Sequence, residues 1–295
     1  LACSTFHQGA FGAALDHAMS GLAEWNPAEH SRYMARYGEH PGVSCNTWAA
    51  LAAWHLGQVE RSQTLADRAI EWGATNAYAR ATAQIQYAFL HQYRDEPERC
   101  REWAAETQDL ARHQGFDFRV AQADVVLAWC DGREGDADRG AAAMTAAIEG
   151  YRRFGARMDE PYYLALLADV ELRRGAGANA RSVLDEAWHL LEGTTRSFFH
   201  EPELHRLSAS AELLVAGPVA GVAEVDALLD LAAASARALG SRPLELRAEL
   251  DRVALRVAHG DAAPDLGRIR AVAASYDADD RFPDLDRARD LLAGA

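Results

Sequence analysis

A unit of about forty residues recurs along the chain, and this period restricts the possible folds more than any other feature. Its clearest mark is a series of prolines spaced 41, 41 and 40 residues apart, each followed by a leucine-containing run: Pro161, Pro202, Pro243 and Pro283. Proline fits the first turn of a helix, where its missing N–H would have had no partner. We therefore expect each of these prolines to begin the first helix of a repeated unit.

A second mark follows each expected first helix, as a short break that contains Gly or Asp. The breaks lie at Gly57, Asp95, Gly135, Gly175, Gly217 and Gly260. A glycine directly after a helix can take the left-handed conformation that ends the helix. Seven positions before the breaks the residue is small in five of six units, for example Ala50 and Ala88. Small residues on one helical face let two helices approach closely, so the unit is expected to be a helix hairpin.

Stacked hairpins bury each other's apolar faces, so the expected fold is all-α: a right-handed superhelix of antiparallel helix hairpins. Alternating runs of Val, Ile and Thr, which would indicate strands, are missing. We expect an N-terminal helix and connector over 1–42, as a truncated repeat, with 5–24 forming one helix. An array of about six hairpins is expected over 43–295. The start of the sequence has neither Met nor a basic signal region, which is typical of a fragment of a longer chain.

The acidic balance of the chain argues against two classes of partner. The sequence has 30 Lys and Arg against 44 Asp and Glu, a formal net charge of −14. A nucleic-acid-binding surface needs basic residues to neutralise phosphates, and anionic membranes repel an acidic surface. No stretch of 18 consecutive apolar residues occurs either. We therefore expect no direct nucleic-acid binding, no membrane association and a cytoplasmic location.

Motifs for catalysis, metal binding or cofactor binding are missing from the sequence. It has no G-x-S-x-G nucleophile motif, no CxxC pair and no phosphate-binding G-x-x-x-x-G-K-[ST] motif. Acidic pairs such as Asp159-Glu160 fall at loops and helix starts, where the helix dipole favours carboxylates. Glu201 and His205 are four positions apart and share a helix face, but a third metal ligand is not evident. The sequence therefore predicts no catalytic residue, no metal ligand and no cofactor.

A column of polar residues on the expected first helices is the candidate binding site. Eleven positions before the breaks, the residue is polar in five of six units. If the first helices line the concave face of the superhelix, this column forms a polar stripe there, with two tyrosines and a histidine beside it. The predicted ligand-binding residues are Asn46, Gln84, Tyr87, Asp124, Tyr163, His205 and Arg206. A solvated face with no dedicated ligand stays open as the alternative.

Four segments of the chain carry a family resemblance, within residues 38–215. They are His40-Pro-Gly-Val-Ser-Cys with the following Trp-Ala-Ala-Leu-Ala-Ala-Trp-His-Leu-Gly57, Ala88-Phe-Leu-His-Gln, Pro161-Tyr-Tyr-Leu-Ala-Leu-Leu-Ala168, and Glu201-Pro-Glu-Leu-His-Arg-Leu207. The hairpins resemble tetratricopeptide repeats, although the period exceeds the roughly 34 residues of that repeat. The closer resemblance is to tetratricopeptide-like regions of large ATPase-containing bacterial regulators. These include LuxR-type and antibiotic-pathway transcription regulators and signalling proteins named as adenylate cyclases.

The resemblance implies a helical sensor or scaffold arm that acts in signal transduction and transcription regulation. Such an arm would bind a protein, a peptide or a small effector and control an ATPase domain upstream in the parent chain. The residues themselves leave two alternatives open. One is a structural spacer or self-association module. The other is an enzyme with a bowl-shaped helical active site, which would need a closed pocket with titratable groups of shifted pKa.

Overall fold

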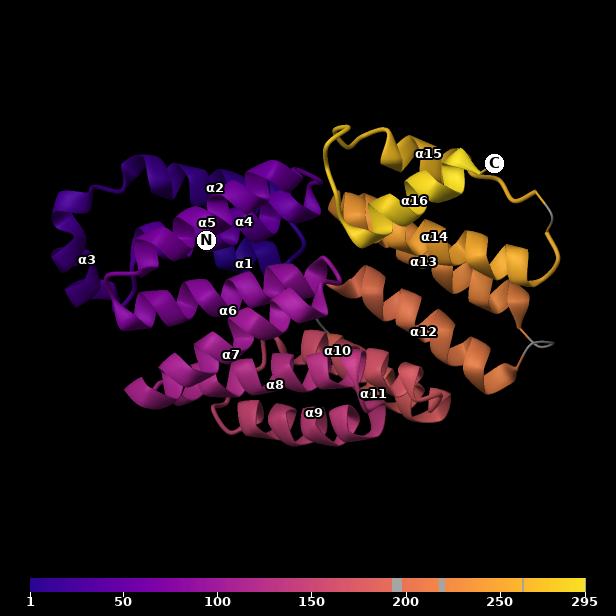
Figure 1. The fold of residues 1–295 in the computed structure, drawn as a ribbon, viewed down its shortest axis with the longest axis horizontal. Coiled ribbons are helices and arrows are strands. Elements are labelled where there is room, and N and C mark those ends of the chain that lie inside the picture. The colour runs from indigo at the N-terminus through magenta and orange to yellow at the C-terminus, as the bar shows by residue number, and fades with distance from the viewer. Residues whose placement is uncertain (193–197, 218–220, 262, 295) are drawn as a thin grey trace.

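The computed structural model describes residues 1–192, 198–217, 221–261 and 263–294 (Figure 1). These residues form sixteen α-helices and one short 3-10 helix, and they form no strand. The helices are α1 (Ala2–His7), α2 (Phe11–Glu24), η1 (Pro27–Glu29), α3 (His30–Tyr37), α4 (Pro41–His55), α5 (Val59–Gly73), α6 (Ala77–Tyr93), α7 (Pro97–Gln114), α8 (Asp117–Glu134), α9 (Ala137–Arg152), α10 (Glu160–Arg173), α11 (Gly177–Leu191), α12 (Glu201–Ala216), α13 (Val222–Leu239), α14 (Arg242–Ala258), α15 (Gly267–Ala273) and α16 (Pro283–Ala293).

Consecutive helices pack as hairpins. The pairs are α4 with α5, α6 with α7, α8 with α9, α10 with α11, and α12 with α13, and α14 contacts both α15 and α16. The first helices α4, α6, α8, α10, α12 and α14 also contact one another in series. The expected fold class, an all-α superhelix of antiparallel helix hairpins, is therefore confirmed.

Burial separates the helices into an inner and an outer layer. In α6, every residue from Ala81 to Tyr93 is buried, whereas α7 buries only a single stripe, Cys100, Ala104, Thr107 and Ala111. A stripe at intervals of three and four residues is the mark of a helix with one solvated face, and burial on all sides is the mark of an interior helix. The first helices therefore form the inner layer, and the second helices cover them.

The sequence marks fall where the repeat places them, with one exception. All four prolines of the series lie in the first turn of a helix, in α10, α12, α14 and α16. The breaks at 57, 95, 175, 217 and 260 have positive φ, and Asp95 has the left-handed value of 61°. Gly135 differs, with φ −138° and ψ −120°, so the turn between α8 and α9 has another geometry.

The N-terminal segment does not form one helix over 5–24. It is divided at Gly9, which has φ +70° and separates α1 from α2. An added Cβ there would lie 2.6 Å from Leu239 Cδ2, so the neighbouring helix also leaves no room for a side chain. Beyond it, α2 packs along α4 in the manner of the second helix of a preceding hairpin. The domain division at residue 42 stays a prediction.

The last hairpins return to the first one, which closes the superhelix (Figure 1). Nδ1 of His55 lies 2.9 Å from Oγ of Ser241, and the rings of Trp54 and Phe282 meet edge to face with centroids 4.9 Å apart. The first and last helices of the inner layer therefore contact each other across a buried interior. Phe199, which precedes α12, lies in this interior and donates its backbone N–H to the His7 carbonyl at 3.1 Å.

Candidate functional site

The interior contains a cavity of about 410 Å³, which we call the aromatic cavity. Residues of α4, α6, α8 and α10 line it, and α1 contributes a further part of the wall. The wall combines rings with a few polar groups, and its residues include Phe6, His7, Trp48, Thr82, Gln86, Phe89, Phe118, Arg119, Gln122, Asp159 and Tyr162. A concave site of a few hundred Å³ with apolar walls and a few convergent polar groups is typical of small-molecule binding.

His7 and Asp159 join α1 to the start of α10 in this wall. Nε2 of His7 lies 2.9 Å from Oδ1 of Asp159, and its Nδ1 lies 2.8 Å from the carbonyl oxygen of Cys3. Burial favours the neutral ring, but the hydrogen bonds to Asp159 and Cys3 outweigh it and raise the pKa of His7 to about 10. Both ring nitrogens donate to oxygen, so the ring is a cation at neutral pH and offers no free lone pair.

Arg119 is the most unusual charged group of the cavity. Its side chain lies between the rings of Tyr78 and Phe118, with centroids 5.3 and 5.8 Å from its Cζ. It donates to Oε1 of Gln122 at 2.7 Å and to Oγ1 of Thr82 at 3.0 Å, both of them neutral acceptors. Its Nε is buried and has no hydrogen-bond partner. A cation is thus held in the wall by rings and neutral dipoles alone.

The polar positions of the aromatic cavity recur with the repeat. Ser44, Thr82 and Gln122 stand thirteen positions before their breaks, and Trp48 and Gln86 stand nine positions before theirs. The predicted stripe used the column at eleven. Two positions turn a helix by about 200°, so the column at eleven points almost directly away from the column at nine. The columns at thirteen and nine were therefore the signal in the sequence that could have located this cavity.

The residues predicted as a stripe lie at helix contacts and are not brought together. Asn46 is fully buried and donates to the Gly42 carbonyl at 2.7 Å. Gln84 donates to Glu106 at 2.9 Å, and Asp124 accepts from Gln108 at 2.5 Å. Both of these contacts tie a first helix to α7 in the outer layer.

The remaining four stripe residues are also engaged within the fold. Tyr87 donates to Asp67 at 2.6 Å, and Tyr163 is buried with its ring edge to face on that of Tyr151. The ring of His205 lies 4.7 Å from that of Trp188. None of the seven lines the aromatic cavity, and Arg206 lines a separate cavity.

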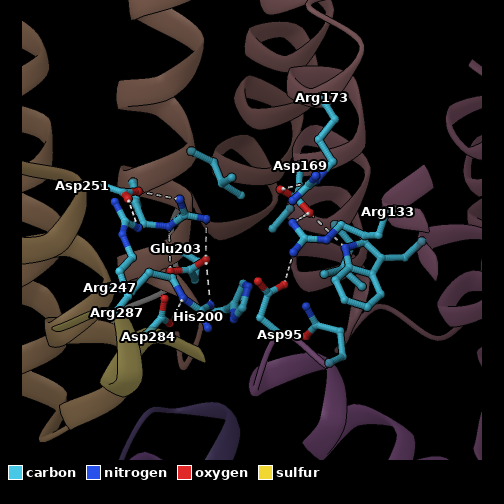
Figure 2. Close-up of a pocket in the computed structure, with 16 residues that line it drawn as sticks. Asp95, Arg133, Asp169, Arg173, His200, Glu203, Arg247, Asp251, Asp284 and Arg287 are labelled. Carbon is cyan, nitrogen blue, oxygen red and sulfur yellow. Dashed lines mark hydrogen bonds and ion pairs between the residues drawn. The ribbon is translucent and has the colours of Figure 1, made fainter. Parts of the chain in front are cut away.

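Figure 2 shows this second cavity, of about 240 Å³, which we call the ionic cavity. In the view, Asp95, Arg133, Asp169 and Arg173 face Glu203, Arg247, Asp251, Asp284 and Arg287 across it. With Arg206, the lining holds five arginines and five carboxylates, and its formal charges cancel. Its residues come from α6, α8 and α10 on one side and from α12, α14 and α16 on the other. The cavity therefore lies between these two groups of helices.

Ion pairs within the fold engage the buried charges of the ionic cavity. Arg206 holds Glu203 through two contacts of 3.0 Å and reaches Asp251 at 2.8 Å. Arg247 binds Asp284 at 2.7 Å and the Tyr93 carbonyl at 3.0 Å. Burial favours protonated Glu203, but the two arginines outweigh it and hold the pKa of that carboxyl well below its usual range. The formal charges of the ionic cavity thus cancel, and its ion pairs and hydrogen bonds connect α12, α14 and α16 to α6.

The described parts of the chain hold neither a metal cluster nor a membrane-spanning helix. Within those ranges, no three His, Cys, Asp or Glu side chains are grouped so that they could hold a metal ion. Glu201 and His205 do meet on their helix face, with 3.9 Å between Oε1 and Nε2. No described helix has the length and apolar character needed to cross a membrane.

Comparison with solved structures finds a likeness to the apo form of RapI, known from a crystal structure. The two chains share 14% sequence identity, with a TM-score of 0.48, over 84% of this chain and 90% of that one. No family model matches the chain, and no curated protein matches it. A likeness at this level adds nothing to the functional inference, which therefore depends on the cavities.

Proposed function

We propose that the chain is a non-catalytic module that binds a small effector, or the end of a peptide, inside its closed superhelix. The observation that supports this is the aromatic cavity, with about 410 Å³ of space between rings and a few polar side chains. Because the superhelix is closed, a whole partner helix has no groove along the inner layer. A partner protein would bind the outer helices, and the ligand of the interior would be small.

In this proposal the module is the sensor arm of a bacterial signal-transduction or transcription regulator. Helix α1 forms part of the cavity wall through Phe6 and His7. A ligand in the cavity would therefore contact the helix that stands closest to an ATPase domain upstream in the parent chain. Ligand binding would stabilise one position of α1 and so bias the domain before it.

Two alternatives fit these contacts less well. A structural spacer, which only sets distances, does not require a buried cation such as Arg119 at a cavity. An enzyme needs a titratable group that can accept or release a proton at the reacting atom. In the aromatic cavity, both nitrogens of His7 are engaged within the fold, and burial raises the pKa of Tyr93, Tyr151 and Tyr162, so these phenols stay protonated at neutral pH. We therefore propose binding without catalysis, and no cofactor.

The proposal is tested by filling the cavity. Ala156→Trp places a large ring at the aromatic cavity, and Ala278→Trp places the same ring on an exposed loop as the matched control. The unmodified protein and both variants would be screened by thermal shift against metabolites and short peptides, because a ligand that binds the folded state raises Tm. We expect compounds that stabilise the unmodified protein and Ala278→Trp but not Ala156→Trp. Equal shifts in all three proteins, or no shift with any compound, would contradict the proposal.

A further inference from the structure

We propose that the ligand of the aromatic cavity is an organic carboxylate with an apolar body, and that Arg119 is its charge partner. This inference rests on the proposed function and names the chemistry of the same site. Arg119, Gln86 and the surrounding rings are the groups that would recognise such a ligand.

Arg119 has no counter-ion within the described part of the chain. The residue is only 7% exposed, yet in the described part of the chain no carboxylate pairs with it. Buried charges are normally paired, because an unpaired one loses its hydration without compensation. The arginines of the ionic cavity follow that rule, as Arg206 and Arg247 do. Arg94 is also buried without an ion pair, but it lines neither cavity.

The wall of the aromatic cavity has unequal numbers of cations and anions. The aromatic cavity is lined by His7, Arg119 and Arg157 against Glu39 and Asp159, so three cations face two anions. Asp159 is paired with His7, and Arg157 is paired with Glu160 at 2.9 Å, outside the cavity wall. Glu39 is exposed and accepts a hydrogen bond from Oγ of Ser44 at 3.1 Å, so Arg119 is the buried charge of the wall that has no ionic partner. A planar guanidinium with a free Nε–H can bind a carboxylate through two parallel hydrogen bonds.

The side-chain oxygen of Gln86 is an acceptor that has no donor. Oε1 of Gln86 is buried and unpartnered, and Gln86 is 8% exposed. Gln86 stands one helical turn from Thr82, which accepts a hydrogen bond from Arg119. The side chains of Thr82 and Gln86 therefore lie roughly 6 Å apart along the helix. A ligand that satisfies both groups carries an N–H or O–H donor close to its carboxylate.

The apolar part of the ligand would lie against the rings of the cavity. The rings of Trp48, Phe89, Phe118 and Tyr162 line the same cavity, and aromatic walls bind apolar and aromatic bodies by burial and edge contacts. The same carboxylate chemistry could come from a free metabolite or from the C-terminus of a peptide. The test therefore includes both sources.

The binding test uses acids beside their primary amides. The probes are N-acetyl-L-phenylalanine, N-acetyl-L-tryptophan, phenylpropionate and the peptide Gly-Gly-Phe, each as free acid and as amide. We expect at least one acid to bind the unmodified protein about tenfold or more tightly than its amide, measured by calorimetry. Arg119→Met should remove this preference. Arg112→Met, on the outer helix α7 and away from both cavities, should keep it. Tighter binding of Gly-Gly-Phe than of the other acids indicates a peptide end, and tighter binding of phenylpropionate indicates a metabolite without a peptide bond.

Two results of this test overturn the inference. One is that no acid binds better than its amide, and the other is that the preference survives in Arg119→Met. If acids and amides bind equally and Ala156→Trp abolishes both, the cavity is still a binding site and only its carboxylate chemistry is wrong. If no probe binds and the wider screen is empty too, the proposed function fails as well.

A second measurement needs no ligand. If the function of Arg119 is to bind the ligand, its unpaired charge lowers the stability of the ligand-free protein. Arg119→Met should then leave Tm unchanged or raise it. Arg133→Met is the matched control, because Arg133 is also largely buried but pairs with Asp95 and Asp169. It should lower Tm. A drop in Arg119→Met as large as that in Arg133→Met would show that Arg119 is a structural clamp.

Discussion

His7 makes two hydrogen bonds that only the protonated ring can make together, one to a carboxylate and one to a carbonyl. Its pKa is about 10 in the folded protein, against 6.5 when exposed. The folded state therefore holds one more proton than the unfolded state between these two values. The stabilisation is complete below about pH 6.5 and is lost as the pH rises toward 10.

The pH dependence of stability should reveal this proton. We expect the free energy of unfolding to fall between pH 7 and pH 9, by at most about 1.4 kcal/mol per pH unit from one group. In His7→Gln the curve should be flatter over the same range, and urea unfolding at several pH values measures both curves. Asp159→Asn removes the partner and should flatten the curve as well. Parallel curves for all three proteins would show that His7 is not charged in the fold.

At the scale of the element, two glycines of α9 have opposite roles. An added Cβ at Gly140 would lie 2.4 Å from the Cα of Gly132, so α8 and α9 cross there with no space for a methyl group. Gly150 is in the same helix and has nothing within 4 Å of its added Cβ. The first glycine is required by packing, and the second only weakens the helix.

The two positions provide a matched pair of substitutions. Gly140→Ala should lower the free energy of unfolding by about 1–3 kcal/mol, because the helices must separate or distort. Gly150→Ala should raise it by about 0.5–1 kcal/mol through helix propensity. Chemical denaturation measures both changes. Equal effects in the two variants would mean that the crossing of α8 and α9 is looser than the structure has it.

The elements also show how far the sequence could predict this protein. The prolines and the left-handed breaks located most hairpins, because both act on the backbone of their own helix. Ligand binding by the column at eleven stays a prediction, but its residues lie at helix contacts and not together, because their direction depends on how far each first helix is rotated about its axis. The small residues at Ala50 and Ala88 indicated a close contact, but they did not show on which side of it the interior lies. The column at eleven is two residues from the columns at thirteen and nine, and two residues turn a helix by about 200°, so it lies on the opposite face of the first helices.

At the scale of the whole molecule, the contacts between the first and last hairpins could not be predicted from the repeat. They depend on the pitch of the superhelix, which accumulates from small rotations between neighbouring hairpins. His55 and Ser241 are 186 positions apart, and neither residue type signals the other. The aromatic cavity is likewise lined by helices far apart in the sequence, from α1 to α10, so its assembly could not be predicted from the repeat either.

Closure should make unfolding cooperative across the molecule. Phe282 is 3% exposed and packs on Trp54 in the first hairpin. Phe282→Ala should cost about 3–5 kcal/mol and should increase hydrogen exchange in α4 as well as in α16. Phe154→Ala, at a ring that is 49% exposed, is the control and should cost far less. Faster exchange in α16 alone would show that the two ends are independent.

The joined ends also limit how a protein of this shape can change over evolutionary time. An open solenoid can gain or lose a unit by duplication or deletion, because each unit contacts only its neighbours. Here an extra unit would move Ser241 and Phe282 away from the positions that meet His55 and Trp54. The number of units between these residues is therefore fixed by geometry, and variation should be confined to the loops and to the solvent face of the outer helices.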